Sequence, residues 1–192
     1  MQIGPYQVRT VLAGTFRLDG GAMFGSVPRT LWERKNPPDE SNRIELATRL
    51  LWLEGGGRKI LVDAGNGDKF DERAAEMFAI KVEPPEEWGV AVEEVTDVIL
   101  THLHFDHAGG NTMRDGGGHI VPAFPRARYL VNERELEFAS RDNARIRASY
   151  PPQNFEPIVA AGLQDLVDGE ALITEGVRVL PTPGHVPFHQ SV

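Results

Sequence analysis

The apolar residues of this chain fall in short runs that end at glycine, proline or asparagine, a pattern typical of a domain rich in β-strands. Such runs predict strands over residues 6–19, 44–53, 59–63, 96–101, 128–131 and 177–180, the first of which suits either a strand or a hairpin. Three glycines separate the second run from the third, so these two are expected to form a β-hairpin. The run over 96–101 is continuously apolar between polar ends, as in a strand buried on both faces.

Helical spacing of apolar residues predicts helices between these strands. They are expected over residues 69–80, 86–94 and 132–140, and in pieces broken at prolines over 141–165. Asn132 is placed to cap the third helix, with Glu135 at the third helical position as in a capping box. Two segments rich in turn residues, 20–25 and 36–42, are expected to be loops. Without repeats or a linker, the alternation of strands and helices indicates one α/β domain over 1–192.

Charge narrows the partners that this domain can have. The 192 residues include 20 Lys and Arg against 28 Asp and Glu, which gives a formal net charge of −8. An acidic balance argues against a nucleic-acid partner, because phosphate binding needs a basic face. No segment approaches the roughly 20 apolar residues that span a bilayer, and the amino terminus lacks the pattern of a leader peptide. We therefore expect a cytoplasmic protein without a membrane partner.

The most informative stretch follows the buried strand directly, where His102, His104, Asp106 and His107 stand close together. In an extended segment, side chains two residues apart point the same way, so His102 and His104 can converge on one ion and Asp106 would extend that row. His107 can turn to a second ion nearby. A single histidine is more often an ordinary core or surface residue. Several imidazoles and a carboxylate at the end of an apolar strand are costly without a cation, so the cluster indicates a metal site.

A second histidine motif stands far downstream, where Thr182-Pro183-Gly184-His185 follows the last apolar run. By itself His185 is an ordinary loop histidine. Together with His102 and His104 it would complete a set of nitrogen ligands with an open position for water, as a catalytic zinc site requires. The chain contains no cysteine, which excludes thiolate zinc sites, so any metal must be held by nitrogen and oxygen.

The two motifs, THLHFDHAGG and TPGHVPFHQS, resemble the H-x-H-x-D-H and TPGH segments of the metallo-β-lactamase-fold hydrolases. The segment ILVDAG over 60–65 is similar to the family's strand that ends in an Asp-x-Gly turn. There Asp63 would support the metal ligands without binding metal, although it is also an ordinary turn residue. Residues 16–49 resemble the branch that contains N-acyl-homoserine lactonase-like and methyl-parathion-hydrolase-like enzymes.

The resemblance implies an α/β (α+β) fold, the αβ/βα sandwich, with the metals at one edge of two sheets. It implies a zinc-dependent hydrolase of a small molecule, a lactone, ester or phosphotriester, which is attacked by a hydroxide activated between two Zn²⁺ ions. Asp106 and His107 would then belong to the second ion, with Asp106 also acting catalytically on a proton. Met23 and Phe24 are candidates for an apolar substrate wall, and equally for plain core residues.

The chain departs from the family pattern after the second motif. Family members continue with a further β-α half that supplies a bridging Asp and a final His, which have no counterpart here. We therefore expect a domain that lacks its C-terminal part, binds one zinc in place of two, and can self-associate as a homo-oligomer through exposed sheet surface. Two alternatives stay open. One is an iron-dependent redox enzyme on the same fold, because nitrogen and oxygen ligands also suit iron or manganese. The other is a noncatalytic metal-binding fragment.

Overall fold

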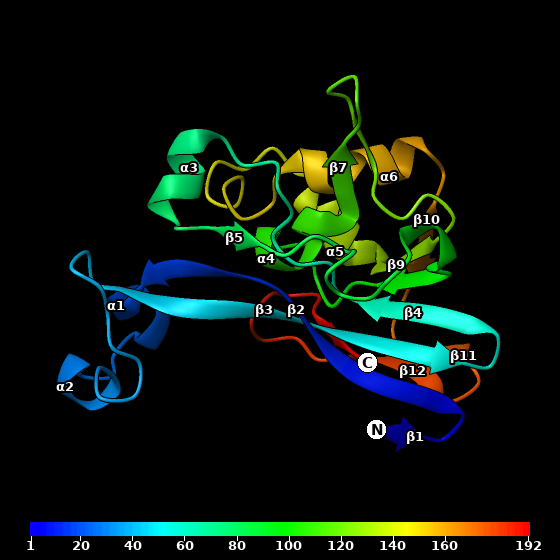
Figure 1. The fold of residues 1–192 in the computed structure, drawn as a ribbon, viewed down its shortest axis with the longest axis horizontal. Helices are drawn as coiled ribbons and strands as arrows, with labels where there is room; N and C mark the ends of the chain where they lie inside the picture. The colour runs from blue at the N-terminus through cyan, green and yellow to red at the C-terminus, as the bar shows by residue number, and fades with distance from the viewer.

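An eight-stranded sheet forms the centre of the computed structural model, which describes residues 1–192 (Figure 1). The strands lie in the order β1-β2-β3-β4-β6-β9-β10, and β5 pairs with β2. The pairs from β1 to β4 are antiparallel and those from β4 to β10 are parallel. The strands are β1 Gln2–Ile3, β2 Tyr6–Asp19, β3 Arg43–Gly55, β4 Arg58–Val62, β5 Lys81–Val82, β6 Asp97–Ile99, β9 Arg128–Asn132 and β10 Gln164–Val167.

Helices cover one face of this sheet and a second sheet covers the other (Figure 1). The helices on the main body are α3 Glu72–Met77, α4 Phe105–Ala108, α5 Glu133–Ala139 and α6 Glu156–Ala160. The second sheet has the strands β11 Ala171–Thr174, β12 Val177–Pro181 and β13 Gln190–Ser191. These layers confirm the mixed α/β architecture expected from the sequence. None of the helices is long and apolar enough to cross a membrane.

The parallel strands supply the core on both of their faces. In β4, Leu61 packs into the cluster of 23 buried residues under the helices, whereas its neighbour Ile60 packs into the cluster of 10 between the two sheets. In β6, Val98 and Ile99 divide in the same way. Successive side chains of a strand point to opposite faces, so a strand with both faces covered needs apolar residues at every position. This confirms the prediction from the continuous run at 96–101.

Residues 20–25 were expected to form a loop, but most of them form a short helix at the end of a long projection. β2 and β3 run beyond the main body to the short helices α1 Gly20–Phe24 and α2 Arg29–Trp32 (Figure 1). Asp19 caps α1, because its Oδ1 accepts a hydrogen bond of 2.7 Å from the Ala22 backbone N–H. Trp32 closes over Gly20, where an added Cβ would lie 2.5 Å from the ring. The cap and the tryptophan together make this glycine-rich segment helical.

Three helix predictions need correction. The helix expected over 69–80 is limited to α3, which Asp71 caps through a 2.7 Å hydrogen bond from the Ala74 N–H. Residues 86–94 form turns and the 3-10 turn Val92–Glu94, with Gly89 in the left-handed region at φ 65°. Pro157 does not break a helix: it lies in the first turn of α6, where the missing N–H costs nothing.

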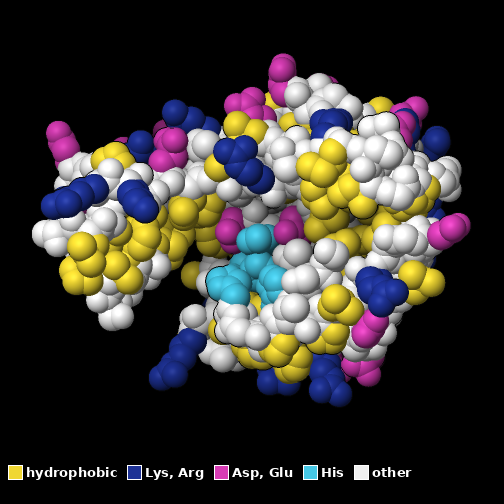
Figure 2. Space-filling model, turned by 90° about the horizontal axis from the view of Figure 1, so that it is seen from below, with side chains coloured by type: hydrophobic (Ala, Val, Ile, Leu, Met, Phe, Trp, Pro, Cys, Tyr) yellow, Lys and Arg dark blue, Asp and Glu magenta, His cyan; other side chains and the backbone are white.

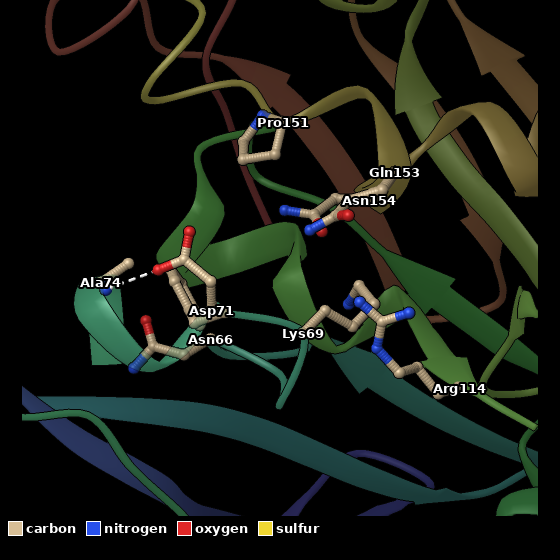
Figure 3. A pocket seen from close by; sticks show the side chains of 9 residues that line it. Asn66, Lys69, Asp71, Ala74, Arg114, Pro151, Gln153 and Asn154 are labelled. Carbon is tan, nitrogen blue, oxygen red and sulfur yellow. Dashed lines mark hydrogen bonds between the residues drawn. The ribbon is translucent and has the colours of Figure 1, made fainter. Parts of the chain in front are cut away.

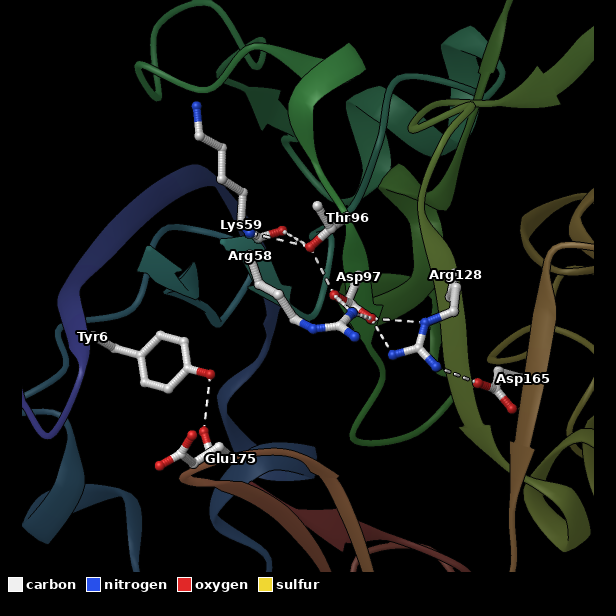
Figure 4. Close-up of polar contacts among 8 residues, drawn as sticks. All are labelled: Tyr6, Arg58, Lys59, Thr96, Asp97, Arg128, Asp165 and Glu175. Atoms are coloured by element: carbon white, nitrogen blue, oxygen red, sulfur yellow. Dashed lines mark hydrogen bonds and ion pairs between the residues drawn. The ribbon is translucent and has the colours of Figure 1, made fainter. Parts of the chain in front are cut away.

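A buried ion network ties the parallel strands together at their amino ends (Figure 4). Asp97 at the start of β6 is 0% exposed. Its carboxylate pairs with Arg58 of β4 at 2.9 Å and accepts a hydrogen bond of 2.9 Å from the Nε of Arg128 in β9. Arg128 also pairs with Asp165 of β10 at 2.8 Å. The opposite, carboxyl end of β6 leads into the histidine motif.

Candidate metal centre

The loop after β6 brings the histidine motif to the carboxyl ends of the parallel strands. β13 holds this loop, because Gln190 donates from its backbone N–H to the Thr101 carbonyl at 3.0 Å and from its amide to the Leu100 carbonyl at 2.8 Å. His104 has an extended backbone and occupies the N-cap position of α4, without a side-chain capping hydrogen bond. Asp106 therefore lies on a helix, and the expectation that it continues an extended row of side chains is wrong.

Three histidines converge at this edge of the molecule. The ligating nitrogens of His102, His104 and His185 all lie within 4.8 Å of one another. The closest pair is His104 Nδ1 and His185 Nε2, at 3.1 Å. Figure 2 shows the histidine side chains gathered at a hollow, with acidic side chains beside them. The structure thus brings together the three residues that the sequence singled out as ligands of one ion.

The donor set fits a divalent cation. His102 is 1% exposed, and its Nε2 is buried without a hydrogen-bond partner. Burial and the neighbouring histidines lower the pKa of His102 to about 2, and burial together with His185 lowers the pKa of His104 to about 4. Both imidazoles are therefore neutral, which is the form that binds metal. Nitrogen donors that converge in this way suit zinc and other transition metals alike.

Asp106 and His107 lie beside this group and pair with carboxylates. His107 Nδ1 is 2.8 Å from Asp63 Oδ2, and His107 Nε2 is 3.4 Å from Asp106 Oδ2. Burial acts to lower the pKa of His107, but these two carboxylates outweigh it and raise the pKa to about 10. Both ring nitrogens of His107 are thus engaged by carboxylates, whereas His102, His104 and His185 each offer one nitrogen to a common point.

Asp63 is linked to His102 through Thr101, to which the sequence analysis gave no role. The Thr101 hydroxyl donates to Asp63 and lies 3.0 Å from His102 Nδ1. Asp63 has the left-handed backbone conformation, at φ 60°, which is uncommon for a residue with a side chain. Thr101 stands directly before the first histidine, and that position was its only signal in the sequence.

Glu135 and Tyr150 were also missed. Glu135 does not complete a capping box: its Oε1 accepts a 3.1 Å hydrogen bond from the backbone N–H of Leu103, between the two histidines. The Tyr150 ring packs edge-on against His104, with the ring centroids 4.7 Å apart. Sequence spacing could not reveal either contact, because both cross between separate elements.

Met23 and Phe24 lie in α1, on the projection. Met23 is 46% exposed, and Phe24 stacks on Trp32 with a centroid distance of 5.0 Å. Phe24 has no aromatic contact with the histidines. Their part in a substrate wall stays a prediction.

Known proteins share both the motif and the fold. Residues 47–192 match the family model described as the Metallo-beta-lactamase superfamily. The chain is 31% identical over 105 residues to an N-acyl homoserine lactonase of Bacillus sp., a match that covers 54% of this chain and 34% of the relative. The lactonase AttM of Azorhizobium caulinodans is 28% identical over 111 residues, 54% of this chain and 37% of the relative. The chain thus spans about a third of the length of the curated relatives it matches.

Solved structures extend the similarity to nearly the whole chain. A probable metal-dependent hydrolase from Staphylococcus aureus superposes with a TM-score of 0.87 at 26% identity, over 99% of this chain and 69% of that one. A quorum-quenching N-acyl homoserine lactone lactonase has a TM-score of 0.69 at 25% identity, over 99% of this chain and 68% of that one. AidC, a dizinc quorum-quenching lactonase, shares the fold at 17% identity and a TM-score of 0.71, over 99% of this chain and 67% of that one. The chain belongs to the metallo-beta-lactamase superfamily.

Proposed function

We propose that this chain carries the metal centre of a zinc-dependent hydrolase that opens a lactone, an ester or a phosphotriester. The observation that carries the proposal is the convergence of His102, His104 and His185 on one point, with the imidazoles of His102 and His104 neutral. Relatives named N-acyl homoserine lactonase support a lactone as the first substrate to test.

In this proposal His102, His104 and His185 hold one ion. A bound zinc ion would polarise the scissile oxygen and lower the pKa of water toward neutrality. Asp63 and Thr101 orient the first ligand, because the Thr101 hydroxyl fixes the position of the His102 Nδ1 face. The Leu103 N–H bond to Glu135 holds the backbone between the two strand-end ligands.

We assign Asp106 and His107 to a second ion, with Asp106 also holding a proton during turnover. Their mutual contact supports the proton role, since Asp106 Oδ2 lies 3.4 Å from a ring nitrogen of His107. The same contact favours the protonated form of His107. A second ion must therefore compete with this proton, because ligands must be deprotonated to bind metal. Occupancy of this second position is therefore expected to rise with pH. Met23 and Phe24 are proposed as an apolar wall for the substrate.

A noncatalytic metal-binding role is the second candidate, and the carboxylate partners at both ring nitrogens of His107 favour it, since they leave only one set of converging nitrogens. Redox chemistry at iron is compatible with the same donors. Metal analysis separates these candidates: stoichiometric iron would contradict the hydrolase.

The test combines metal content with turnover. The chain is purified from metal-balanced medium, bound metal is measured, and hydrolysis of an acyl-homoserine lactone, an aryl ester and a paraoxon-like phosphotriester is followed. We expect bound zinc and turnover of at least one substrate, with both lost in His104→Ala. The matched control is His119→Ala, because His119 is an exposed loop histidine with a side chain 80% accessible. Metal-loaded protein that turns over none of the substrates would overturn the hydrolase.

A further inference from the structure

A polar cavity lies apart from the histidines, between the segment before α3, the strand β7 Thr112–Arg114 and the turn Pro152–Asn154. Its volume is about 360 Å³. None of the proposed metal ligands lines it. The polar side chains around it are Asn66, Lys69, Asp71, Arg114, Gln153 and Asn154 (Figure 3).

Lys69 is a buried cation in the wall of this cavity, at 5% exposure. Its ammonium donates to the backbone carbonyls of Gly109 and Thr112, the latter at 2.7 Å, and pairs with no carboxylate. An ammonium carries three N–H donors, so one donor is left without a protein acceptor. Burial lowers the pKa of Lys69 to about 8, although the neighbouring Asp68 carboxylate acts to raise it.

Arg114 adds a second positive charge to the same cavity. Figure 3 shows the ends of Lys69 and Arg114 together on one side of the space. The guanidinium forms no ion pair, and its one hydrogen bond is a long contact of 3.4 Å to the Gly118 carbonyl. Arg114 also contributes to the lowered pKa of Lys69, as expected for two close cations. The carboxylate at the opposite side, Asp71, is already engaged as the cap of α3.

Amide side chains complete the lining. Asn66 is 2% exposed, and neither its nitrogen nor its oxygen has a partner in the chain. The segment that carries it packs closely on the loop at Gly109: a Cβ there would lie 1.8 Å from the Asn66 carbonyl oxygen, so the two loops touch through their backbones. Buried polar groups are ordinarily hydrogen-bonded, which makes an orphaned amide beside two unpaired cations informative.

We propose that this cavity binds a small anion, a carboxylic acid or phosphate compound, through Lys69 and Arg114. An oxyanion placed there accepts the free N–H of Lys69 and the guanidinium donors of Arg114, and charge-assisted hydrogen bonds of this kind are the strong ones. The Asn66 amide, which has no partner in the chain, and the amides of Gln153 and Asn154 would offer further hydrogen bonds to the same ligand. The site is independent of the metal-dependent activity.

The test is calorimetric titration of the purified chain with inorganic phosphate and, separately, with succinate, at constant ionic strength in sodium chloride. We expect saturable binding of at least one anion, weakened at least about tenfold by Arg114→Gln, because this variant removes the charge-assisted hydrogen bonds of the guanidinium. Arg114 lies on an exposed part of its strand, so this variant is expected to fold. Arg126→Gln is the matched control, because Arg126 is an exposed arginine outside the cavity and should leave binding unchanged.

A second variant separates this cavity from the metal centre, where phosphate can also bind. His104→Ala removes a proposed metal ligand and should leave anion binding intact. The relative affinity for phosphate and succinate then identifies the class of ligand. The proposal is overturned when neither anion binds saturably, when Arg114→Gln binds as the parent does, or when His104→Ala abolishes binding.

Discussion

The carboxylate of Asp63 accepts hydrogen bonds from both the backbone N–H and the hydroxyl of Thr101, at 2.8 and 3.0 Å. This pair fixes the residue directly before His102, and the same hydroxyl lies 3.0 Å from His102 Nδ1. With Nδ1 held in this way the His102 ring has one orientation, and its Nε2, which has no partner in the chain, would be presented to a bound ion. Asp63 makes these contacts from the left-handed backbone conformation, at φ 60°.

Removing the Thr101 hydroxyl is expected to weaken metal binding. Loss of such outer partners typically costs about 10–100-fold in metal affinity, so Thr101→Val should fall in that range while Thr101→Ser keeps the hydroxyl and the affinity. Competition with a chromogenic chelator measures both. Equal affinity of the valine and serine variants would contradict the proposed role.

Metal removal is expected to destabilise the folded chain. A ligand that binds only the folded state stabilises it by about 4 kcal/mol at a thousand times its Kd. The thermal midpoint should therefore fall when a chelator strips the zinc and return when zinc is added. His185→Ala should abolish this response and His119→Ala should keep it. An unchanged thermal midpoint of the parent protein after chelator is added would argue against a bound ion.

Raising the pH from 7 to 10 is expected to destabilise the metal-free chain through His107. Burial acts to lower its pKa, but Asp106 and Asp63 raise it to about 10, whereas an unfolded histidine titrates near about 6.5. The folded state thus holds the proton more tightly. The resulting stabilisation is fully present below the unfolded pKa and is lost as the pH rises through the folded one.

Thermal midpoints measured in chelator across this pH range check the contribution of His107. The parent and His119→Gln should lose stability between pH 7 and 10, and His107→Gln should lose less. Identical slopes for all three proteins would show that His107 does not carry the effect.

Removing the charge of Asp97 from the ion network is expected to destabilise the fold far more than removing the charge of Asp165, which pairs with Arg128 at the edge of the network. Removing one partner of a buried pair costs about 3–5 kcal/mol, so Asp97→Asn should shift the urea midpoint strongly. Asp165→Asn removes an exposed partner of Arg128 and should cost at most about 1 kcal/mol. Similar losses in the two variants would contradict the central place of Asp97.

Glu135 is expected to act on the metal site through the backbone. Glu135→Gln keeps an acceptor for the Leu103 N–H, whereas Glu135→Leu leaves this buried donor unpaired at a cost of about 1–3 kcal/mol. The leucine variant should lose both stability and zinc affinity, and the glutamine variant should retain both. A leucine variant that binds zinc like the parent would limit Glu135 to a role in packing.

Local spacing alone was enough to predict the strands β4, β6 and β9 and the cluster around His102. These strands could be predicted from the sequence because both of their faces are buried, and a strand buried on both faces needs mostly apolar residues. The histidine motif could be recognised from the sequence because its members are neighbours along the chain. The cap of α5 was predicted for the same reason, since Asn132 contacts only the next few residues.

Contacts between distant elements depended on the tertiary structure. His104 meets His185 across 81 residues, and Lys69 reaches the Thr112 carbonyl across 43, because the sheet topology brings their loops to a shared edge. Glu135 is fully buried and turns inward to Leu103, which leaves the capping box unformed, because a buried backbone donor needs an acceptor. Periodicity records which face of an element is buried, but the partner on that face follows only from the packing of the whole chain.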